Sequence, residues 1–340
     1  MTEKRLKLAI VGCTGAVGEA MLEILLQRKF PLSELIPLAS ERSAGSELSF
    51  GRQKLIVRDL ESFDFAGVDI ALFSAGGSVS KAHAPRAAAA GTWVIDNSSE
   101  FRYVKHIPLV VSEVNPEAIA MAREHRIIAN PNCSTMQMLV ALAPIHRAVG
   151  IRRINVATYQ SVSGAGRSAM EELGRQTSAL LNFQKPKCER FPVQIAFNVI
   201  PQIDQFMDNG YTREEMKMVW ETQKILDPKI KVNPTAVRVP VFYGHAEAIH
   251  LETREPITPA RVRELLGAAP GIKLVDEPVA GGYPTPVTHA AGTDPVYVGR
   301  IRTDISHPRG LSMWVVADNL RKGAALNAVQ LAELLVQHYL

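Results

Sequence analysis

A short apolar segment at residues 6–11 runs directly into a glycine-rich loop and then into an amphipathic stretch at residues 16–27. The loop spaces Gly12, Gly15 and Gly18 three residues apart. Glycines at these positions let backbone N–H groups approach a pyrophosphate, and the N-terminus of the following helix favours its negative charge. The pattern predicts a dinucleotide-binding unit, with a tight strand–helix turn that binds nothing as the alternative.

The first third of the chain continues this alternation of short apolar runs and helical stretches. Strands are predicted at residues 35–39, 68–73 and 93–96, and an alanine-rich helix at residues 82–90. Strands that alternate with helices in this way form a parallel, doubly wound sheet.

The chain beyond Gly150 predicts longer strands, several with alternating apolar and polar residues. Helical segments separate these strands, which is typical of an α+β domain with a mostly antiparallel sheet. The C-terminal segment predicts a single helix whose apolar stripe has to be buried. The predicted strands are 154–162, 235–242, 246–253 and 297–304, and the predicted helices are 168–181, 213–226, 259–268 and 319–340.

Length and charge limit the classes of protein to consider. A chain of 340 residues is too long for one core, so we expect two domains. The net charge of +4 has no basic run, so it predicts no nucleic-acid partner and suits an anionic small molecule. The longest uncharged run contains two asparagines and two prolines, so no membrane span is expected. Three cysteines and a charged N-terminus without an apolar leader predict a cytoplasmic protein.

Cys133 has the placement that a nucleophile needs. It stands in Asn-Pro-Asn-Cys-Ser-Thr (130–135), just before a predicted helix at residues 136–145. A helix N-terminus favours the thiolate, and its free N–H groups can hold an oxyanion. Cys13 and Cys188 are interpreted as small apolar side chains in the interior.

Arg238 and His245 lie seven residues apart. On an unbroken strand this odd separation would direct them to opposite faces, but Gly244 permits a turn that reorients the histidine. His245 can then accept a proton beside Cys133, and Arg238 can bind a carboxylate through two hydrogen bonds. A structural histidine and an ordinary ion-pair arginine are the alternatives.

The loop after the second predicted strand bears on the choice of cofactor. Ser40, Arg42 and Ser43 can hold a 2′-phosphate, which favours NADP. Glu41 is the residue type that NAD enzymes place on the ribose hydroxyls, and an ordinary polar loop is a further alternative.

Nine motifs follow one another along almost the whole chain. They are Gly-Cys-Thr-Gly-Ala-Val-Gly (12–18), Ala-Ser-Glu-Arg-Ser-Ala-Gly (39–45), Asp-Asn-Ser-Ser-Glu-Phe-Arg (96–102), Asn-Pro-Asn-Cys-Ser-Thr (130–135), Tyr-Gln-Ser-Val-Ser-Gly-Ala-Gly (159–166), Ala-Phe-Asn-Val-Ile-Pro (196–201), Arg-Val-Pro-Val-Phe-Tyr-Gly-His (238–245), Val-Gly-Arg-Ile-Arg (298–302) and Trp-Val-Val-Ala-Asp-Asn-Leu-Arg-Lys-Gly-Ala (314–324). In this order they resemble the aspartate-β-semialdehyde dehydrogenase family.

The resemblance implies an α/β protein with a Rossmann-type doubly wound parallel sheet, formed by residues 1–131 and 319–340. Residues 132–318 would form an α+β catalytic and dimerisation domain with a mostly antiparallel sheet, giving a homodimer or a dimer of dimers. The implied reaction is the NADP-dependent reductive dephosphorylation of L-aspartyl-4-phosphate to L-aspartate 4-semialdehyde through a cysteine acyl-thioester, in the biosynthesis of lysine, threonine, methionine and diaminopimelate. The helix predicted at 168–181 would either face the partner or cover the sheet.

The resemblance also implies a role for individual residues, and no metal. Cys133 would be the nucleophile, Gln160 would orient the substrate or intermediate, and His245 would be the acid–base. Arg238 would bind the α-carboxylate and Glu214 the amine. The phosphate contacts would be Arg102, Asn132 and Lys217. The cofactor contacts would be Gly12, Thr14, Gly15, Ala16, Val17, Gly18, Ser40, Arg42, Ser43, Ser163, Gly164 and Asn319.

Three positions depart from the family pattern. Cys13 replaces a commoner alanine, Glu100 stands where a small residue is usual, and Ser112 replaces a proline. Two other interpretations stay open. One is a relative of the same architecture, such as N-acetylglutamyl-phosphate reductase or glyceraldehyde-3-phosphate dehydrogenase, and the other is a catalytically silent paralogue that binds a nucleotide or a protein.

Overall fold

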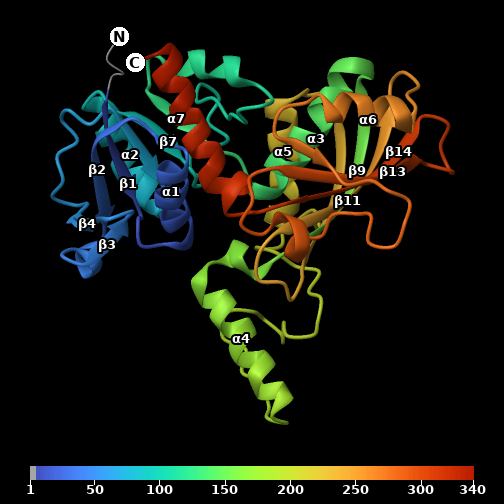
Figure 1. The fold of residues 1–340 in the computed structure, drawn as a ribbon, viewed down its shortest axis with the longest axis horizontal. Coiled ribbons are helices and arrows are strands. Elements are labelled where there is room, and N and C mark those ends of the chain that lie inside the picture. The colour runs from blue at the N-terminus through green and yellow to red at the C-terminus, as the bar shows by residue number, and fades with distance from the viewer. Residues whose placement is uncertain (1–4) are drawn as a thin grey trace. The chain divides into compact units, whose positions relative to one another are not determined.

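The computed structural model describes residues 5–340, which form two compact units, each with its own six-stranded sheet (Figure 1). The first unit contains the chain up to Pro131 and the segment Ala324–Leu340, and the second contains Asn132–Gly323. By this division the chain returns to the first unit after Gly323, whereas the predicted boundary lies between residues 318 and 319. None of the helices in the described part of the chain is long and apolar enough to cross a membrane.

All strands in the sheet of the first unit run parallel, in the order β5-β2-β1-β6-β7-β8. The chain moves outward from β1 on one side and then on the other, which confirms the predicted doubly wound topology. The strands are β1 (Leu6–Val11), β2 (Leu32–Ala39), β5 (Arg58–Asp59), β6 (Ile70–Phe73), β7 (Trp93–Asp96) and β8 (Ile127–Ala129).

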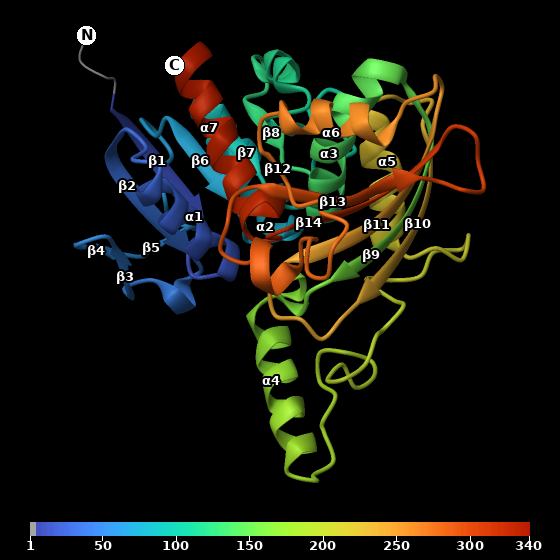
Figure 2. The ribbon, with the colours of Figure 1, turned by 45° about the vertical axis from the view of Figure 1, so that its right-hand side comes forward.

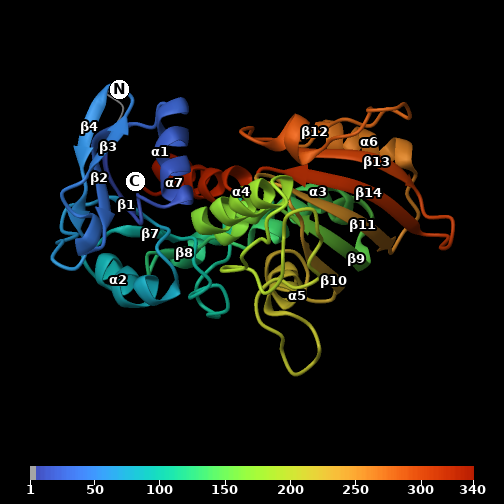
Figure 3. The same cartoon turned by 90° about the horizontal axis from the view of Figure 1, so that it is seen from below.

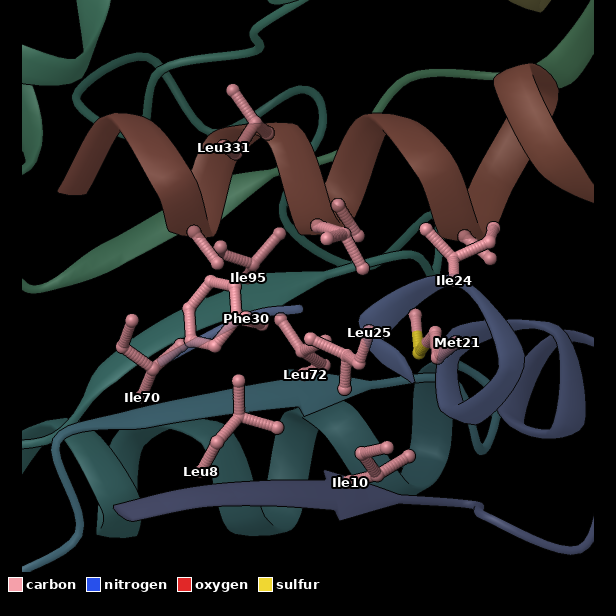
Figure 4. Packing of buried hydrophobic residues seen from close by; sticks show 14 of the residues in the cluster. Leu8, Ile10, Met21, Ile24, Leu25, Phe30, Ile70, Leu72, Ile95 and Leu331 are labelled. Carbon is pink, nitrogen blue, oxygen red and sulfur yellow. The ribbon is translucent and has the colours of Figure 1, made fainter. Parts of the chain in front are cut away.

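Helices α1 (Ala16–Gln27) and α7 (Leu326–His338) contact each other and share one core with the strands. Figure 4 shows side chains of β1, β6 and β7 meeting those of α1, together with Leu331 of α7. Helix α2 (Gly77–Ala89) packs against β6, β7 and β8, and a hairpin of β3 (Glu47–Phe50) and β4 (Gln53–Ile56) follows β2.

The prediction of a single helix at residues 319–340 is wrong at its start. Asp318 Oδ1 accepts the backbone N–H groups of Leu320 and Arg321, which fixes a turn there. A π-helical turn, Arg321–Ala325, then leads into α7, which begins at Leu326. The apolar stripe of α7 is buried, as expected.

The second unit contains a mixed sheet in the order β10-β9-β11-β14-β13-β12, and Figure 3 shows these strands lying side by side. The three central pairings are antiparallel and the two outer ones are parallel. The strands are β9 (Ile151–Gln160), β10 (Lys231–Arg238), β11 (His245–Thr253), β12 (Ile272–Leu274), β13 (Val296–Thr303) and β14 (Gly310–Ala317).

The strand predicted at residues 235–242 is wrong at its end, because β10 stops at Arg238. Pro240 has no N–H for a ladder hydrogen bond, and Gly244 adopts a positive φ of 86° immediately before β11. Arg238 therefore ends one strand and His245 begins another, which replaces the opposite-face geometry of an unbroken strand.

A layer of three helices covers the sheet of the second unit: α3 (Cys133–Val149), α5 (Arg213–Ile225) and α6 (Pro259–Gly267). Helix α4 (Arg167–Leu181) instead projects away from the sheet (Figure 2), so it does not cover it. The loop that follows α4 leaves Cys188 exposed, and the interpretation of this cysteine as a buried side chain is wrong.

Candidate active site

Cys133 is the first residue of α3, three residues earlier than the predicted start of that helix. Asn132 caps the helix, because its Oδ1 accepts the backbone N–H groups of Ser134 at 3.0 Å and Thr135 at 3.3 Å. The thiol is partly exposed. A thiolate at this position is stabilised by the positive end of the helix dipole.

The sheet brings three of the predicted residues to one edge. Gln160 ends β9, Arg238 lies opposite it at the end of the parallel strand β10, and His245 begins the antiparallel strand β11. All three side chains are buried. Strand pairing thus gathers positions that are far apart in the sequence.

Two carboxylates of helix α5 accept hydrogen bonds from Asn132, the residue before Cys133. Glu214 Oε1 accepts a hydrogen bond from Nδ2 of Asn132 at 2.9 Å, and Glu221 Oε2 accepts the backbone N–H of Asn132 at 2.6 Å. Glu221 is not among the site residues predicted from the sequence. Its signal is the spacing of seven residues from Glu214, two helical turns along the same buried face.

Glu214 connects several parts of the site. Its Oε1 also accepts a hydrogen bond from Nε2 of Gln160 at 3.2 Å, and its Oε2 lies 3.0 Å from Nζ of Lys217. Lys217 in turn contacts Asp204 at 2.9 Å. Burial opposes ionisation of Glu214, but the charge of Lys217 and the hydrogen bonds outweigh it and lower the pKa to about 2. The carboxylate is therefore charged and suited to bind an ammonium group.

His245 is fully buried, and its Nδ1 accepts the backbone N–H of Ser161 at 3.1 Å. The proton of the neutral ring therefore lies on Nε2, which has no hydrogen-bond partner among residues 5–340. Burial and the nearby charge of Arg238 lower the pKa of His245 to about 3, against an opposing effect of Glu214. The imidazole is neutral at physiological pH and presents an N–H group.

Arg238 is held beside this ring, since its Nη1 donates to the carbonyl of Ser161 at 2.7 Å. Burial lowers the pKa of Arg238, whereas Glu214 and the Cys133 thiolate oppose that effect. The guanidinium therefore lies within electrostatic range of both the nucleophile and the predicted amine ligand.

Asn319 has a structural function in this unit. Its Oδ1 accepts hydrogen bonds from Ser161 Oγ at 3.0 Å, Ser163 Oγ at 3.1 Å and the Gly244 N–H at 3.0 Å. These bonds tie together the loops on both sides of His245. The cofactor contacts predicted for Ser163, Gly164 and Asn319 stay predictions.

The glycine loop of the first unit fits a pyrophosphate. Gly12 has a positive φ of 85°, and a Cβ atom on Gly18 would lie only 2.3 Å from the carbonyl oxygen of Gly12. Gly15 caps α1 without a side chain, which leaves the first N–H groups of this helix open to an anion. Ser40, which precedes the 3₁₀ turn Glu41–Ser43, and Arg42 within it are exposed, and Ser43 is half-buried. Thr14 is exposed in the glycine loop.

The departures from the family pattern have local explanations. Cys13 is buried in the core of the first unit, where burial raises its pKa to about 11. The carboxylate of Glu100 lies near Gly77 at the start of α2, and Arg102 is buried and donates to the carbonyl of Asn97 at 2.8 Å. The backbone N–H of Ser112 donates to Asn327 Oδ1 of α7 at 3.1 Å, a bond that a proline cannot form.

Comparison with known proteins gives a consistent result over the whole chain. Two family models match, the NAD binding domain of semialdehyde dehydrogenase over residues 7–122 and its dimerisation domain over residues 142–322. Aspartate-semialdehyde dehydrogenase 2 of Vibrio cholerae is 61% identical over 337 residues, which cover 99% of each chain.

Two solved structures extend this comparison. The crystal structure of aspartate semialdehyde dehydrogenase II complexed with ASA, from Vibrio cholerae, has a TM-score of 0.97 at 61% identity and covers 99% of this chain and 100% of that chain. Aspartate semialdehyde dehydrogenase with NADP from Candida albicans has a TM-score of 0.76 at 26% identity, covering 98% of each chain.

Proposed function

The chain belongs to the aspartate-semialdehyde dehydrogenase family, and from this premise we propose that it reduces L-aspartyl-4-phosphate to L-aspartate 4-semialdehyde with NADPH. Membership makes it an enzyme of amino-acid biosynthesis that uses a nicotinamide cofactor and a small-molecule substrate. The observation that carries the finer proposal is the group of Cys133, Gln160, Glu214, Arg238 and His245 at one edge of the second sheet.

The charges of this group complement those of the proposed substrate. Arg238 is assigned to the α-carboxylate and the ionised Glu214 to the α-ammonium. Asn132, Lys217 and Arg102 are assigned to the phosphate. Lys217 already contacts two carboxylates, so the proposal requires it to move away from Asp204 when phosphate binds.

The proposed reaction begins at the sulfur of Cys133. The thiolate attacks the acyl carbon, the bond from that carbon to the phosphate oxygen breaks, and an acyl-thioester remains on the sulfur. The positive end of the α3 dipole can stabilise the oxyanion that forms during the attack. A nicotinamide cofactor held at the glycine loop of residues 12–18 would supply the hydride that reduces the thioester to a hemithioacetal.

His245 acts on the carbonyl oxygen in this scheme. Its neutral ring presents the Nε2 proton, so it stabilises the developing oxyanion first as a hydrogen-bond donor. Full proton transfer, as expected of an acid–base residue, requires the anionic substrate to raise the pKa of the ring. The proton on the hemithioacetal oxygen then returns to Nε2 of His245 while the carbon–sulfur bond breaks, which releases the aldehyde and restores the thiolate.

The preference for NADP rests on the loop after β2. Arg42 is exposed in the 3₁₀ turn Glu41–Ser43, where its guanidinium can pair with a 2′-phosphate. Glu41 is also exposed there, so the preference depends on which of the two side chains faces the ribose.

The proposal of a homodimer rests on the match of the second unit to a dimerisation domain. The projecting helix α4 and its following loop expose Leu181, Phe183 and Phe197, which are 68%, 100% and 67% accessible. Large apolar side chains left exposed on a protein surface are common at protein interfaces. A second copy of the chain is the proposed partner, and a cytoplasmic location stays part of the proposal.

A spectrophotometric assay tests the proposed activity in the oxidative direction. L-aspartate semialdehyde, phosphate and NADP⁺ should give phosphate-dependent NADPH formation, with a lower rate for NAD⁺ in parallel. N-acetylglutamate semialdehyde and glyceraldehyde 3-phosphate are the matched competing substrates. Higher kcat/KM with either competitor, or no turnover with any of the three, would contradict the proposal.

A further inference from the structure

Glu247 has a fully buried carboxyl group, close to the strand ends of the second sheet where Gln160 and His245 lie. It lies on β11 two residues after His245, and therefore on the same face of the strand. Across the sheet it is paired with Thr158 of β9, whose Oγ1 accepts a hydrogen bond from Gln160 at 3.3 Å. Glu247 is therefore two residues along β11 from His245, and it is paired with a residue two positions before Gln160 on β9.

Gln137 approaches Glu247 from helix α3. It is fully buried on α3, one helical turn after Cys133. Its Nε2 lies at a hydrogen-bonding distance of 3.5 Å from the backbone carbonyl oxygen of His245, and its side chain lies next to the Glu247 carboxyl. Gln137 therefore lies between the element that carries the nucleophile and the element that carries the imidazole.

The hydrogen-bonding capacity of this pair is unfilled. Among residues 5–340, neither carboxyl oxygen of Glu247 has a hydrogen-bond partner, and the same is true of Oε1 of Gln137. Burial raises the pKa of Glu247 well above its usual value, and the Gln137 side chain opposes this only in part. The neutral acid has one O–H donor, and Oε1 of Gln137 is a buried acceptor without a partner among the described residues.

We propose that Glu247 is a positioning residue, whose neutral carboxyl group donates a hydrogen bond to Gln137 while the Gln137 amide holds the backbone carbonyl of His245. The chain of contacts then sets the distance between the start of α3, with Cys133, and the start of β11. The inference rests on the proposed function for its effect on catalysis, but the protonation of Glu247 does not depend on it.

Substitutions that keep or remove the donor test the positioning role. Glu247→Gln retains an N–H donor of similar shape, so its kcat should stay within about threefold of wild type. Glu247→Leu removes the donor but fills the space, so kcat should fall on the order of tenfold or more while KM changes less and the fold is retained. Gln137→Leu should give the same loss, and the double variant should lose no more than either single variant.

Thr222→Val is the matched control, because Thr222 Oγ1 is also buried without a partner among the described residues. Its kcat should equal that of wild type. Full kcat in Glu247→Leu, or additive losses in the double variant, would overturn the positioning role. A loss of kcat in Glu247→Gln equal to that in Glu247→Leu would overturn it as well.

Infrared difference spectroscopy tests the protonation state without any turnover. The spectrum of wild type minus E247Q at pH 7 should contain the C=O stretch of a protonated carboxyl group, shifted in D₂O. A carboxylate band in its place would overturn the inference. An enzyme that shows the protonated band but fails the aspartate semialdehyde assay contradicts only the proposed function.

Discussion

Gly164 lies so close to His245 that a Cβ atom on the glycine would be 3.3 Å from Nε2 of the imidazole. The same atom would be 3.0 Å from Nη1 of Arg238. These two atoms are the donors assigned to the reacting oxygen and the substrate carboxylate. A side chain at position 164 would therefore crowd both the imidazole and the guanidinium.

Gly164→Ala should lower kcat/KM on the order of tenfold, because either donor has to shift by a few tenths of an ångström. Steady-state kinetics in the oxidative direction measure this effect. Gly174→Ala is the matched control, since a Cβ atom there meets nothing within 4 Å in helix α4. Equal kinetics for the two variants would contradict the close packing at Gly164.

The pKa of His245 makes stability depend on pH. It is lowered from 6.5 to about 3 by burial and by Arg238. Between these values the unfolded chain binds a proton that the folded protein does not, so stability is lost as pH falls from 6.5 towards 3. The free energy of unfolding should fall by about 2 kcal/mol between pH 7 and pH 5 from this group alone.

His245→Gln should remove this part of the pH dependence, which chemical denaturation at pH 7 and pH 5 measures. Glu214, with a pKa lowered from 4.5 to about 2, loses its stabilising effect only at lower pH and does not contribute in this range. His250→Gln, a change at an exposed histidine of the same strand, is the control and should keep the wild-type dependence. A wild-type dependence in His245→Gln would show that the buried ring is not the cause.

Cys133→Ser should reduce turnover by at least about 1,000-fold, because a hydroxyl at the start of α3 is a far weaker nucleophile than a thiolate. The affinity for NADP, measured by fluorescence titration, should stay at the wild-type value. Iodoacetamide should label Cys133 in the wild type, and a substrate analogue should protect it. Full activity in the serine variant would rule out a covalent intermediate at this position.

Features that depend on nearby residues could be predicted from the sequence. The bounds of β1, α1 and β7 follow from local hydrophobic periodicity and agree with the structure. The placement of Cys133 near a helix start follows from Pro131, although α3 begins three residues earlier than predicted. These signals lie within a few residues of the feature that they predict.

Features that depend on strand pairing could not be predicted in the same way. Ser161 and His245 meet only because β9 and β11 are neighbours, although 84 residues separate them in the sequence. Glu247 carries no local signal either, because an acidic residue in a strand is usually exposed. The only sequence signal of the break between Arg238 and His245 is Gly244, which permits a turn there.

Arg42→Ala should raise the KM for NADP on the order of tenfold and leave the KM for NAD nearly unchanged. The reason is that a charge-assisted hydrogen bond to the 2′-phosphate contributes about 1.5–3 kcal/mol, and only NADP carries that group. Arg52→Ala is the matched control, an exposed arginine in the turn between β3 and β4. If Arg42→Ala changed both KM values equally, the residue would shape the loop rather than select the nucleotide, and Glu41 would then be the side chain to test on the ribose.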